Sequence, residues 1–424
     1  MARPRRLLPL ALTAALALSV AVFTSPASAG PEKDRDRSAD RGTVRFATFN
    51  ASLNRGAAGE LVEDLSTPDD SQAQAVAEII QRTRPDVLLV NEFDFVDDNV
   101  AVDLFRENYL EVGQNGADPI KYGYSFVAES NTGIPSGLDL NNDGTIGGPD
   151  DAFGFGFFPG QFGMVVYSRY PILEEQVRTF QKFLWKDMPG ALLPDDPATP
   201  EPADWFSDEE LEQVRLSSKS HWDVPIRIGK KTVHFLVSHP TPPVFDTAED
   251  RNGRRNFDEI RFWADYIRPG KRSSYIYDDE GRRGGLRPGS LFVIAGDQNS
   301  DPLDGDSIPG SIQQLIEHPR VNANQTPDSA GAVEASRLQG GANLEHRSDP
   351  RFDTADFADS APGNLRADYV LPSKNLRITD SAVFWPTRDD PLFRLTGNFP
   401  FVPSSDHRLV WVDVRVPGVR HHRP

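Results

Sequence analysis

The sequence of 424 residues predicts one large α/β domain that carries several inserted loops. Short apolar runs typical of strands recur along the chain and are interspersed with helical patterns. No internal repeat is evident, and no linker separates two cores. The chain contains no cysteine, so its stability must come from a large buried core, with any bound metal adding to it.

Residues 1–29 have the pattern of a secretory signal peptide. Three arginines precede an apolar run over 7–22, and the small residues at 27–29 suit cleavage after Ala29. A membrane anchor is the alternative, but the apolar run is short for a bilayer span. The charged residues 30–42 resemble a flexible leader, and no later segment could span a bilayer. We therefore expect a secreted protein, and we expect it to be a monomer.

The first half of the domain begins with a strand over 43–49 that ends at Asn50. A helix capped by Asp70 or Ser71 follows, and Pro85 stops it. The remaining elements of this half are an apolar strand over 87–90 that runs into Glu92, a long loop insertion over 113–160 rich in Gly, Asn and Asp, and a strand over 163–167.

The second half follows the same logic, with polar side chains directly after apolar strands. The expected elements are a loop over 189–202, a strand over 232–238 that ends at His239, a helix over about 257–267 with Asn256 as a possible cap, a strand over 291–295 before Asp297, a polar surface excursion over 322–362, strands over 369–371 and 409–416, and a tail over 418–424. In the last strand, alternating valines predict one buried face.

The charge of the chain bears on its partners. The formal net charge is -18, and loss of the three arginines of residues 1–29 leaves -21 on the mature chain. A protein that grips duplex DNA through its phosphates usually has a basic face, so the acidic balance disfavours non-specific DNA binding. The same balance attracts divalent cations.

Acids, amides and histidines recur at the ends of the predicted strands. Each such residue alone is weak evidence for a functional site, because a single polar residue after a strand usually lies in a turn or on the surface. Together they are more informative, because strand ends are where side chains converge in a crevice. The set consists of Asn50, Glu92, His239, Asp297, Asn299, Asp368, Asp406 and His407.

The segments around these residues resemble the endonuclease/exonuclease/phosphatase superfamily. The matching segments are ATFN, LLVNEFD, LVSHPTPP, VIAGDQNSDP, RADYVLP and SSDHRLVWVDV. They lie between residues 44 and 416, and we assign the domain to 43–417. The resemblance implies a DNase-I-like fold, which is a four-layer α/β sandwich of two packed mixed β-sheets flanked by helices. It also implies metal-dependent hydrolysis of phosphoesters.

The resemblance further implies a catalytic Mg²⁺ or Mn²⁺ held by Asn50, Glu92 and Asp406. Carboxylate and amide oxygens suit Mg²⁺, which takes only one or two carboxylates from protein and keeps several waters. Such a metal would polarise a phosphoryl oxygen and offset developing charge.

The catalytic side chains implied by the resemblance are His239, Asp297, Asn299, Asp368 and His407. Asp297 would orient or deprotonate the attacking water, and Asn299 and His239 would hydrogen-bond the phosphoryl group. Asp368 would fix the tautomer of His407, as the carboxylate of a catalytic triad does. Whether His407 activates water or stabilises the transition state stays open.

A second metal site is predicted inside the insertion. Residues 139–150 match the calcium-loop pattern D-x-[DN]-x-[DN]-G-x₅-[DE], although helical flanks are missing. A solvated Asx-Gly turn is the alternative. The expected ligands of a structural Ca²⁺ are Asp139, Asn141, Asp143, Thr145 and Asp150.

The leading hypothesis is therefore a secreted, metal-dependent phosphodiesterase, nuclease or phosphatase. Its substrate would be nucleic acid, a phospholipid headgroup or a small phosphoester, because a fold alone does not choose among these. Aromatic residues of the insertion, such as Phe155 and Phe158, could contact a base or lipid or could simply pack. The rival hypothesis is a catalytically silent, calcium-stabilised extracellular binding module with the same fold.

Overall fold

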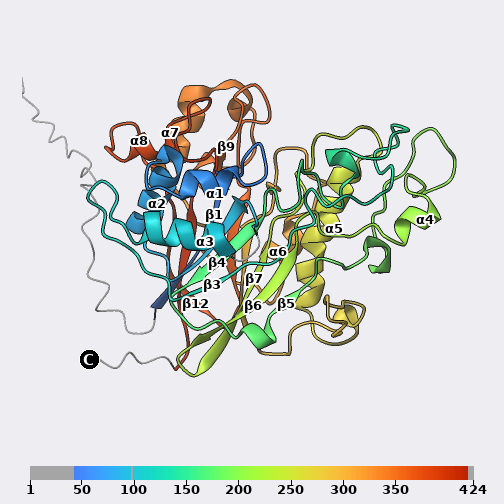
Figure 1. The fold of residues 1–424 in the computed structure, drawn as a ribbon, viewed down its shortest axis with the longest axis horizontal. Helices are drawn as coiled ribbons and strands as arrows, with labels where there is room; N and C mark the ends of the chain where they lie inside the picture. The colour runs from blue at the N-terminus through green and yellow to red at the C-terminus, as the bar shows by residue number, and fades with distance from the viewer. Residues whose placement is uncertain (1–42, 97–98, 419–424) are drawn as a thin grey trace, which may run out of the picture. The chain divides into compact units, whose positions relative to one another are not determined.

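Two β-sheets packed face to face form the centre of the protein (Figure 1). The computed structural model describes residues 43–96 and 99–418. The predicted signal peptide (1–29), the leader (30–42) and tail residues 419–424 lie outside the described residues. None of the described helices combines the length and the apolar character that crossing a bilayer would require.

The first sheet has the strand order β12-β13-β1-β2-β4-β3. Its only parallel pair is β1 with β2, and the other neighbours run antiparallel. The strands are β1 (Thr43–Leu53), β2 (Val87–Phe93), β3 (Tyr124–Phe126), β4 (Met164–Ser168), β12 (Arg377–Val383) and β13 (Val410–Arg415).

The second sheet has the order β11-β8-β7-β6-β5, with β7 and β8 as its parallel pair. A two-stranded ribbon, β9 (Ala355–Asp356) with β10 (Asn364–Leu365), lies outside both sheets. The strands of the second sheet are β5 (Arg178–Thr179), β6 (His221–Ile228), β7 (Lys231–Ser238), β8 (Leu291–Asp297) and β11 (Asp368–Pro372).

Helices cover the outer faces of both sheets and complete four layers (Figure 1). On the first sheet lie α1 (Glu60–Leu65), α2 (Ser71–Thr83) and α3 (Val100–Phe105), which continues as a π-helical turn over Arg106–Leu110. On the second sheet lie α5 (Arg251–Tyr266) and α6 (Gln313–Ile316). The other helical elements are α4 (Asp208–Leu211), α7 (Ala330–Gln339), α8 (Phe393–Thr396) and the 3₁₀ turns Pro149–Asp151, Glu174–Gln176, Trp185–Asp187, Gly270–Ser273, Gly341–Leu344 and Pro350–Phe352.

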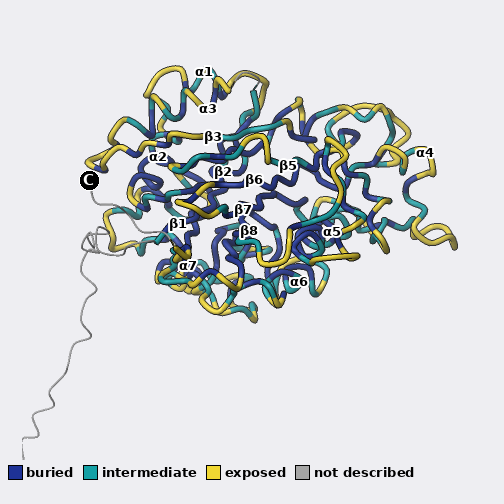
Figure 2. The backbone as a smooth tube through the Cα atoms, turned by 90° about the horizontal axis from the view of Figure 1, so that it is seen from below, coloured by how far each residue is buried: buried dark blue, intermediate teal, exposed yellow. Residues whose placement is uncertain are grey.

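Apolar packing fills all three spaces between the layers. Between the sheets, Phe46 of β1 meets Phe235 of β7 with ring centroids 5.5 Å apart. Outside the first sheet, α2 buries the residues of its apolar face, as the sequence predicts. The central strands are buried, whereas exposed backbone is concentrated in loops (Figure 2). The predicted four-layer α/β sandwich is therefore confirmed.

Several boundaries differ from the sequence prediction. The side chain of Asp70 caps α2, but α5 begins at Arg251 after Asp250, six residues before the predicted Phe257. The excursion over 322–362 contains α7, whose buried face of Ala332 and Ala335 is too small to give a strong apolar pattern. Strand β6 was missed because Pro225 interrupts it, and β12 because its half-exposed sequence is polar.

Candidate active site

The parallel strand pairs of the two sheets end near one another, and polar side chains occupy these ends. On the first sheet, Asn50 of β1 pairs with Asn91 of β2, and Glu92 comes next. On the second sheet, His239 directly follows β7 and Asp297 is the last residue of β8. Carboxyl ends of adjacent parallel strands form a natural crevice for ligands.

Asn50 links the two sheets through its side-chain amide. Its Nδ2 donates to Oε1 of Glu92 at 3.0 Å and to Oδ2 of Asp297 at 3.1 Å. Its Oδ1 accepts from the backbone N–H of Ser52 at 3.2 Å. A second amide, Nδ2 of Asn54, donates to Oε2 of Glu92 at 2.8 Å, so amides orient both carboxylate oxygens.

Asp297 lies close to both histidines of the site. Its Oδ2 lies 3.4 Å from Nε2 of His239 and 3.6 Å from Nε2 of His407, and all three residues are buried. Its Oδ1 accepts from the backbone N–H of Asn299 at 2.8 Å. Burial alone would raise the pKa of Asp297, but the two histidines and Asn50 hold this pKa below its usual value.

His407 is held from the opposite side by Asp368. Nδ1 of His407 lies 2.8 Å from Oδ2 of Asp368, which also accepts from the hydroxyl of Thr354 at 2.8 Å. Burial opposes protonation of this imidazole, but Asp368 and Asp297 raise the pKa of His407 well above its usual value. In contrast, burial and the nearby Lys219 lower the pKa of His239.

Asp406 and Asn299 join the site less directly. The hydroxyl of Ser52 donates to Oδ1 of Asp406 at 3.4 Å, and Ser52 follows Asn50 on the same strand. The side chain of Asn299 donates to the carbonyl of Pro240 at 3.1 Å, next to His239. All eight residues predicted from the sequence thus lie around one centre, whereas their chemical roles stay predictions.

The backbone of the site adopts conformations that side chains disfavour. Glu92 has φ of 56° and Asn299 has φ of 49°. A Cβ on Gly296 would lie 1.9 Å from the carbonyl oxygen of Ser238, so glycine is needed where β7 and β8 approach each other. Strained positions of this kind cluster at functional sites.

The geometry also bears on which residues could hold a metal. Within the described ranges, the three acid or histidine side chains whose ligand atoms all lie within 4.8 Å of one another are Asp297, Asp368 and His407. The short Asp368–His407 contact explains this closeness without a metal, because the two side chains bond each other. The oxygen-rich set of Asn50, Glu92 and Asp406 fits a hard cation better.

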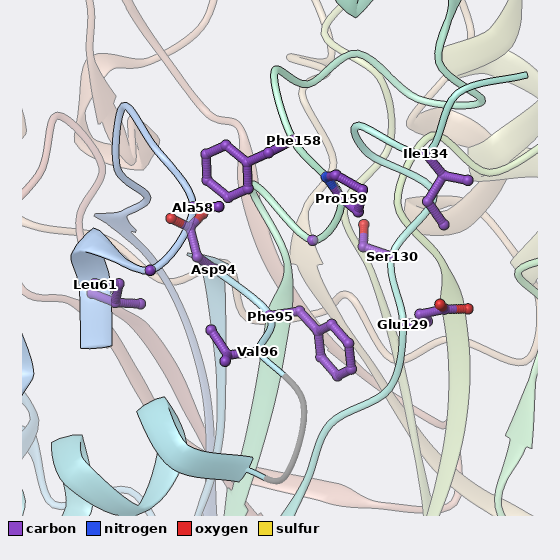
Figure 3. Close-up of a pocket in the computed structure, with 12 residues that line it drawn as sticks. Ala58, Leu61, Asp94, Phe95, Val96, Glu129, Ser130, Ile134, Phe158 and Pro159 are labelled. Atoms are coloured by element: carbon purple, nitrogen blue, oxygen red, sulfur yellow. The ribbon is translucent and has the colours of Figure 1, made fainter. Parts of the chain in front are cut away.

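A pocket of about 260 Å³ lies between the segment that follows β2 and the insertion (Figure 3). Phe95 and Phe158 lie on two of its sides, the first from the segment after β2 and the second from the insertion (Figure 3). Asp94 lines it as well, and burial raises the pKa of Asp94 to about 7 even though the backbone N–H groups of Arg55 and Phe162 donate to its carboxylate.

The loop predicted to bind calcium is pre-folded by its own carboxylates. Asp139 accepts from the backbone N–H groups of residues 143 and 144, and Asp143 accepts from that of Thr145. Asp150 instead lies 3.4 Å from Arg251. Asp151, which the sequence prediction did not include, is buried and accepts from the backbone N–H groups of residues 140 and 147. Asp151 is therefore buried within the loop, whereas Asp150 is exposed.

Sequence reasoning missed other residues of the site. Thr354 comes from the segment interpreted as a surface excursion, and Lys219 comes from the polar segment before the unpredicted β6. Asn91 and Asn54 lie near Glu92 and Asn50 in the sequence, and this nearness was the signal by which they could have been predicted.

The chain matches the model of the endonuclease/exonuclease/phosphatase family over residues 47–407 and belongs to this family. Members of this family are generally phosphoester hydrolases that use divalent metals. A search of curated proteins finds no significant match.

Solved structures with similar folds are distant in sequence. An endonuclease/exonuclease/phosphatase from Beutenbergia cavernae DSM 12333 is 16% identical with a TM-score of 0.47, covering 89% of this chain and 73% of its own. Sphingomyelinase C from Streptomyces griseocarneus is 13% identical with a TM-score of 0.43, covering 88% and 99%. Truncated TDP2 from Caenorhabditis elegans is 15% identical with a TM-score of 0.40, covering 88% and 98%. We infer no substrate from these similarities.

Proposed function

We propose that this protein is a secreted phosphoester hydrolase that depends on a divalent metal and directs water onto phosphorus. The observation that carries the proposal is the buried network in which Asn50, Asp297, His239, His407 and Asp368 meet from both sheets. Asp297 orients or deprotonates the attacking water, because its charged form is favoured in this setting. His407 and His239 donate hydrogen bonds to the phosphoryl oxygens as charge develops on them.

Asn50, Glu92 and Asp406 would hold Mg²⁺ or Mn²⁺. This metal supplies Lewis-acid polarisation of a phosphoryl oxygen. The chemistry of the donor set supports the assignment, since oxygen ligands suit these cations. The amide of Asn54, which is not among the proposed ligands, donates to Glu92 and orients its carboxylate, which is the usual role of groups behind a metal ligand.

The pocket lined by Phe95 and Phe158 would receive the organic group of the substrate. Its Phe95 and Phe158 side chains favour an apolar or aromatic group over a phosphate. If so, Phe158→Ala should raise KM for an aryl phosphodiester more than for a methyl phosphodiester. An equal effect on both substrates would remove the pocket from the proposal.

The proposal is tested on the mature protein with Mg²⁺ or Mn²⁺ and a bis-aryl phosphate. Glu92→Ala and His407→Ala should each abolish turnover. His234→Ala is the matched control, because His234 also bonds a carboxylate, that of Asp223 at 2.8 Å, but outside the site. Equal residual activity in all variants would indicate a contaminant, and an inactive wild type would favour the silent binding module.

A parallel comparison of substrates would define the class. Plasmid DNA, RNA, a phospholipid and a phosphomonoester are assayed under the same conditions. The net charge of -21 on the mature chain disfavours duplex DNA, so we expect smaller phosphoesters to be hydrolysed faster. Secretion is checked in the culture medium, where a mature chain starting at Gly30 is expected.

A structural Ca²⁺ in the 139–151 loop forms the last part of the proposal. Asp139, Asn141, Asp143 and the carbonyl of Thr145 would be ligands, with Asp151 added to the predicted Asp150. Calcium should raise the melting temperature of the wild type but not that of Asp139→Ala. Asp208→Ala, in an exposed acidic segment elsewhere, is the control. Removal of calcium that changes neither stability nor kinetics would contradict this site.

A further inference from the structure

Lys219 is a buried lysine beside the candidate active site. It lies just before β6, and only 7% of its surface is exposed. In the described part of the chain, its ammonium group has neither a hydrogen-bond acceptor nor an ion-pair partner in contact with it. A buried charge without a partner is costly, and proteins rarely keep one without a reason.

Pairing of neighbouring segments holds the backbone of Lys219 near the site. The antiparallel pair of β6 and β7 ends with His221 opposite Ser238, so Lys219, two residues before His221, and His239, directly after Ser238, leave the strands at the same end. The carbonyl of Lys219 accepts from the backbone N–H of Asn131 at 2.9 Å. His239 lies close enough to Lys219 that, after burial, the charge of Lys219 is the next cause that lowers the pKa of His239.

The charges that face Lys219 come from several elements. Burial lowers the pKa of Lys219, and the nearby Arg255 adds to this effect. Glu259 of α5 most strongly, and then Glu92 and Asp297 of the site, favour the charged form of Lys219. The carboxylate of Glu259 is already bonded by the backbone N–H groups of residues 218 and 241, at 2.7 and 2.6 Å. Glu259 thus offsets the charge of Lys219 but leaves its N–H groups unused.

We propose that Lys219 is a further catalytic residue, whose ammonium group donates a hydrogen bond to a non-bridging oxygen of the phosphoryl group. This inference rests on the proposed function, because the anion it expects is the substrate of that site. A fixed cation aimed at the phosphoryl oxygens stabilises the negative charge that they share during transfer. The unused donors of Lys219 are then satisfied only when the phosphoryl group is present.

The test compares Lys219→Met, which keeps the length of the stem without the charge, with Lys219→Arg, which keeps the charge. The exposed Lys182→Met is the matched control. Two readouts are used: kcat and KM on a bis-aryl phosphate, and affinity for inorganic phosphate by calorimetry. Lys219→Met should lower kcat roughly 100-fold, as loss of one oxyanion donor does elsewhere, and weaken phosphate binding at least about tenfold. Lys219→Arg should recover part of both.

The melting temperature separates this role from a purely structural one. Because Lys219 has no bonded partner to leave behind, Lys219→Met should fold with an unchanged or higher melting temperature. If it does not fold, Lys219→Gln is measured in its place. If the wild type is active and Lys219→Met has the same kcat and phosphate affinity, the role of Lys219 is wrong but the proposed function still stands. An inactive wild type whose phosphate binding needs Lys219 would support the anion contact and refute the proposed function.

Discussion

Replacing Asp368 by asparagine tests whether this carboxylate positions His407. Oδ2 of Asp368 lies 2.8 Å from Nδ1 of His407 and accepts from Thr354 at 2.8 Å. Oδ1 is buried and has no hydrogen-bond partner among the described residues. Asparagine has almost the same shape, so the change removes charge and one acceptor without opening a cavity.

The losses of stability and of kcat expected for Asp368→Asn follow from these contacts. With its oxygen toward His407, the asparagine places its NH₂ group where Oδ1 finds no partner, which costs about 1–3 kcal/mol of stability. With the amide reversed, the NH₂ group meets the N–H of His407 and the imidazole loses its orientation. By analogy with the aspartate of a catalytic triad, kcat should fall by roughly 10²–10⁴, which corresponds to about 3–5 kcal/mol of barrier.

The assay measures kcat at saturating metal and the pH profile of the wild type and Asp368→Asn. Asp368 raises the pKa of His407, so the limb that reports His407 should move to lower pH in the variant. Asp258→Asn is the control, because Asp258 is a buried carboxylate bonded by Trp185 and the backbone of Leu192 outside the site. If Asp368→Asn retains kcat within about threefold and the same pH profile, the positioning role is wrong.

Three further substitutions test the packing around the site. Gly296→Ala places a Cβ 1.9 Å from the carbonyl of Ser238, so β7 and β8 must separate, and urea titration should show a loss of about 1–3 kcal/mol; an unchanged midpoint would contradict the close approach. Burial and neighbouring acids raise the pKa of Asp353 to about 9, so the folded state keeps a proton that the unfolded state releases near pH 4, and stability falls as pH rises between these values. From pH 5 to pH 8 the wild type should therefore lose up to about 4 kcal/mol of stability that Asp353→Asn keeps, so the melting temperature of the variant should rise relative to that of the wild type. A difference in melting temperature that does not change with pH would refute the raised pKa. Arg408→Met leaves Asp356 buried without its ion pair at 2.8 Å and should cost about 3–5 kcal/mol in the same titration, and a neutral result would contradict a structural pair.

The strand ends of the site were predictable because buried strands give continuous apolar runs. Residues 291–295 run directly into Asp297, and 232–238 run into His239, so local sequence shows where each strand stops and which polar side chain follows. The family resemblance added which ends belong together. Their meeting around Asp297 is a consequence of sheet order, which no local pattern contains.

There are physical reasons why the sequence did not predict the other residues of the site. Thr354 precedes the two-residue strand β9, which is too short to show a period, and it reaches Asp368 only through tertiary contacts. Lys219 stands in the polar run SSKS, which gives no sign of burial, and the proline in β6 masks the strand that positions it. In the loop predicted to bind calcium, the pattern makes Asp150 the last ligand, which stays a prediction, and the turn over Pro149–Asp151 buries the neighbouring Asp151, which the pattern does not mark.

Three of the costs in this structure lie where the chemistry is expected. Glu92 and Asn299 hold backbone conformations that cost on the order of 1–3 kcal/mol each, and Lys219 keeps a buried charge unbonded. Three apolar cores, one between the sheets and one under each helical layer, can offset these costs without help from the site. In the proposed function, each of the three residues supplies a hydrogen-bond donor or a metal ligand at the same centre. Their shared location is what we expect if a phosphoryl group binds there.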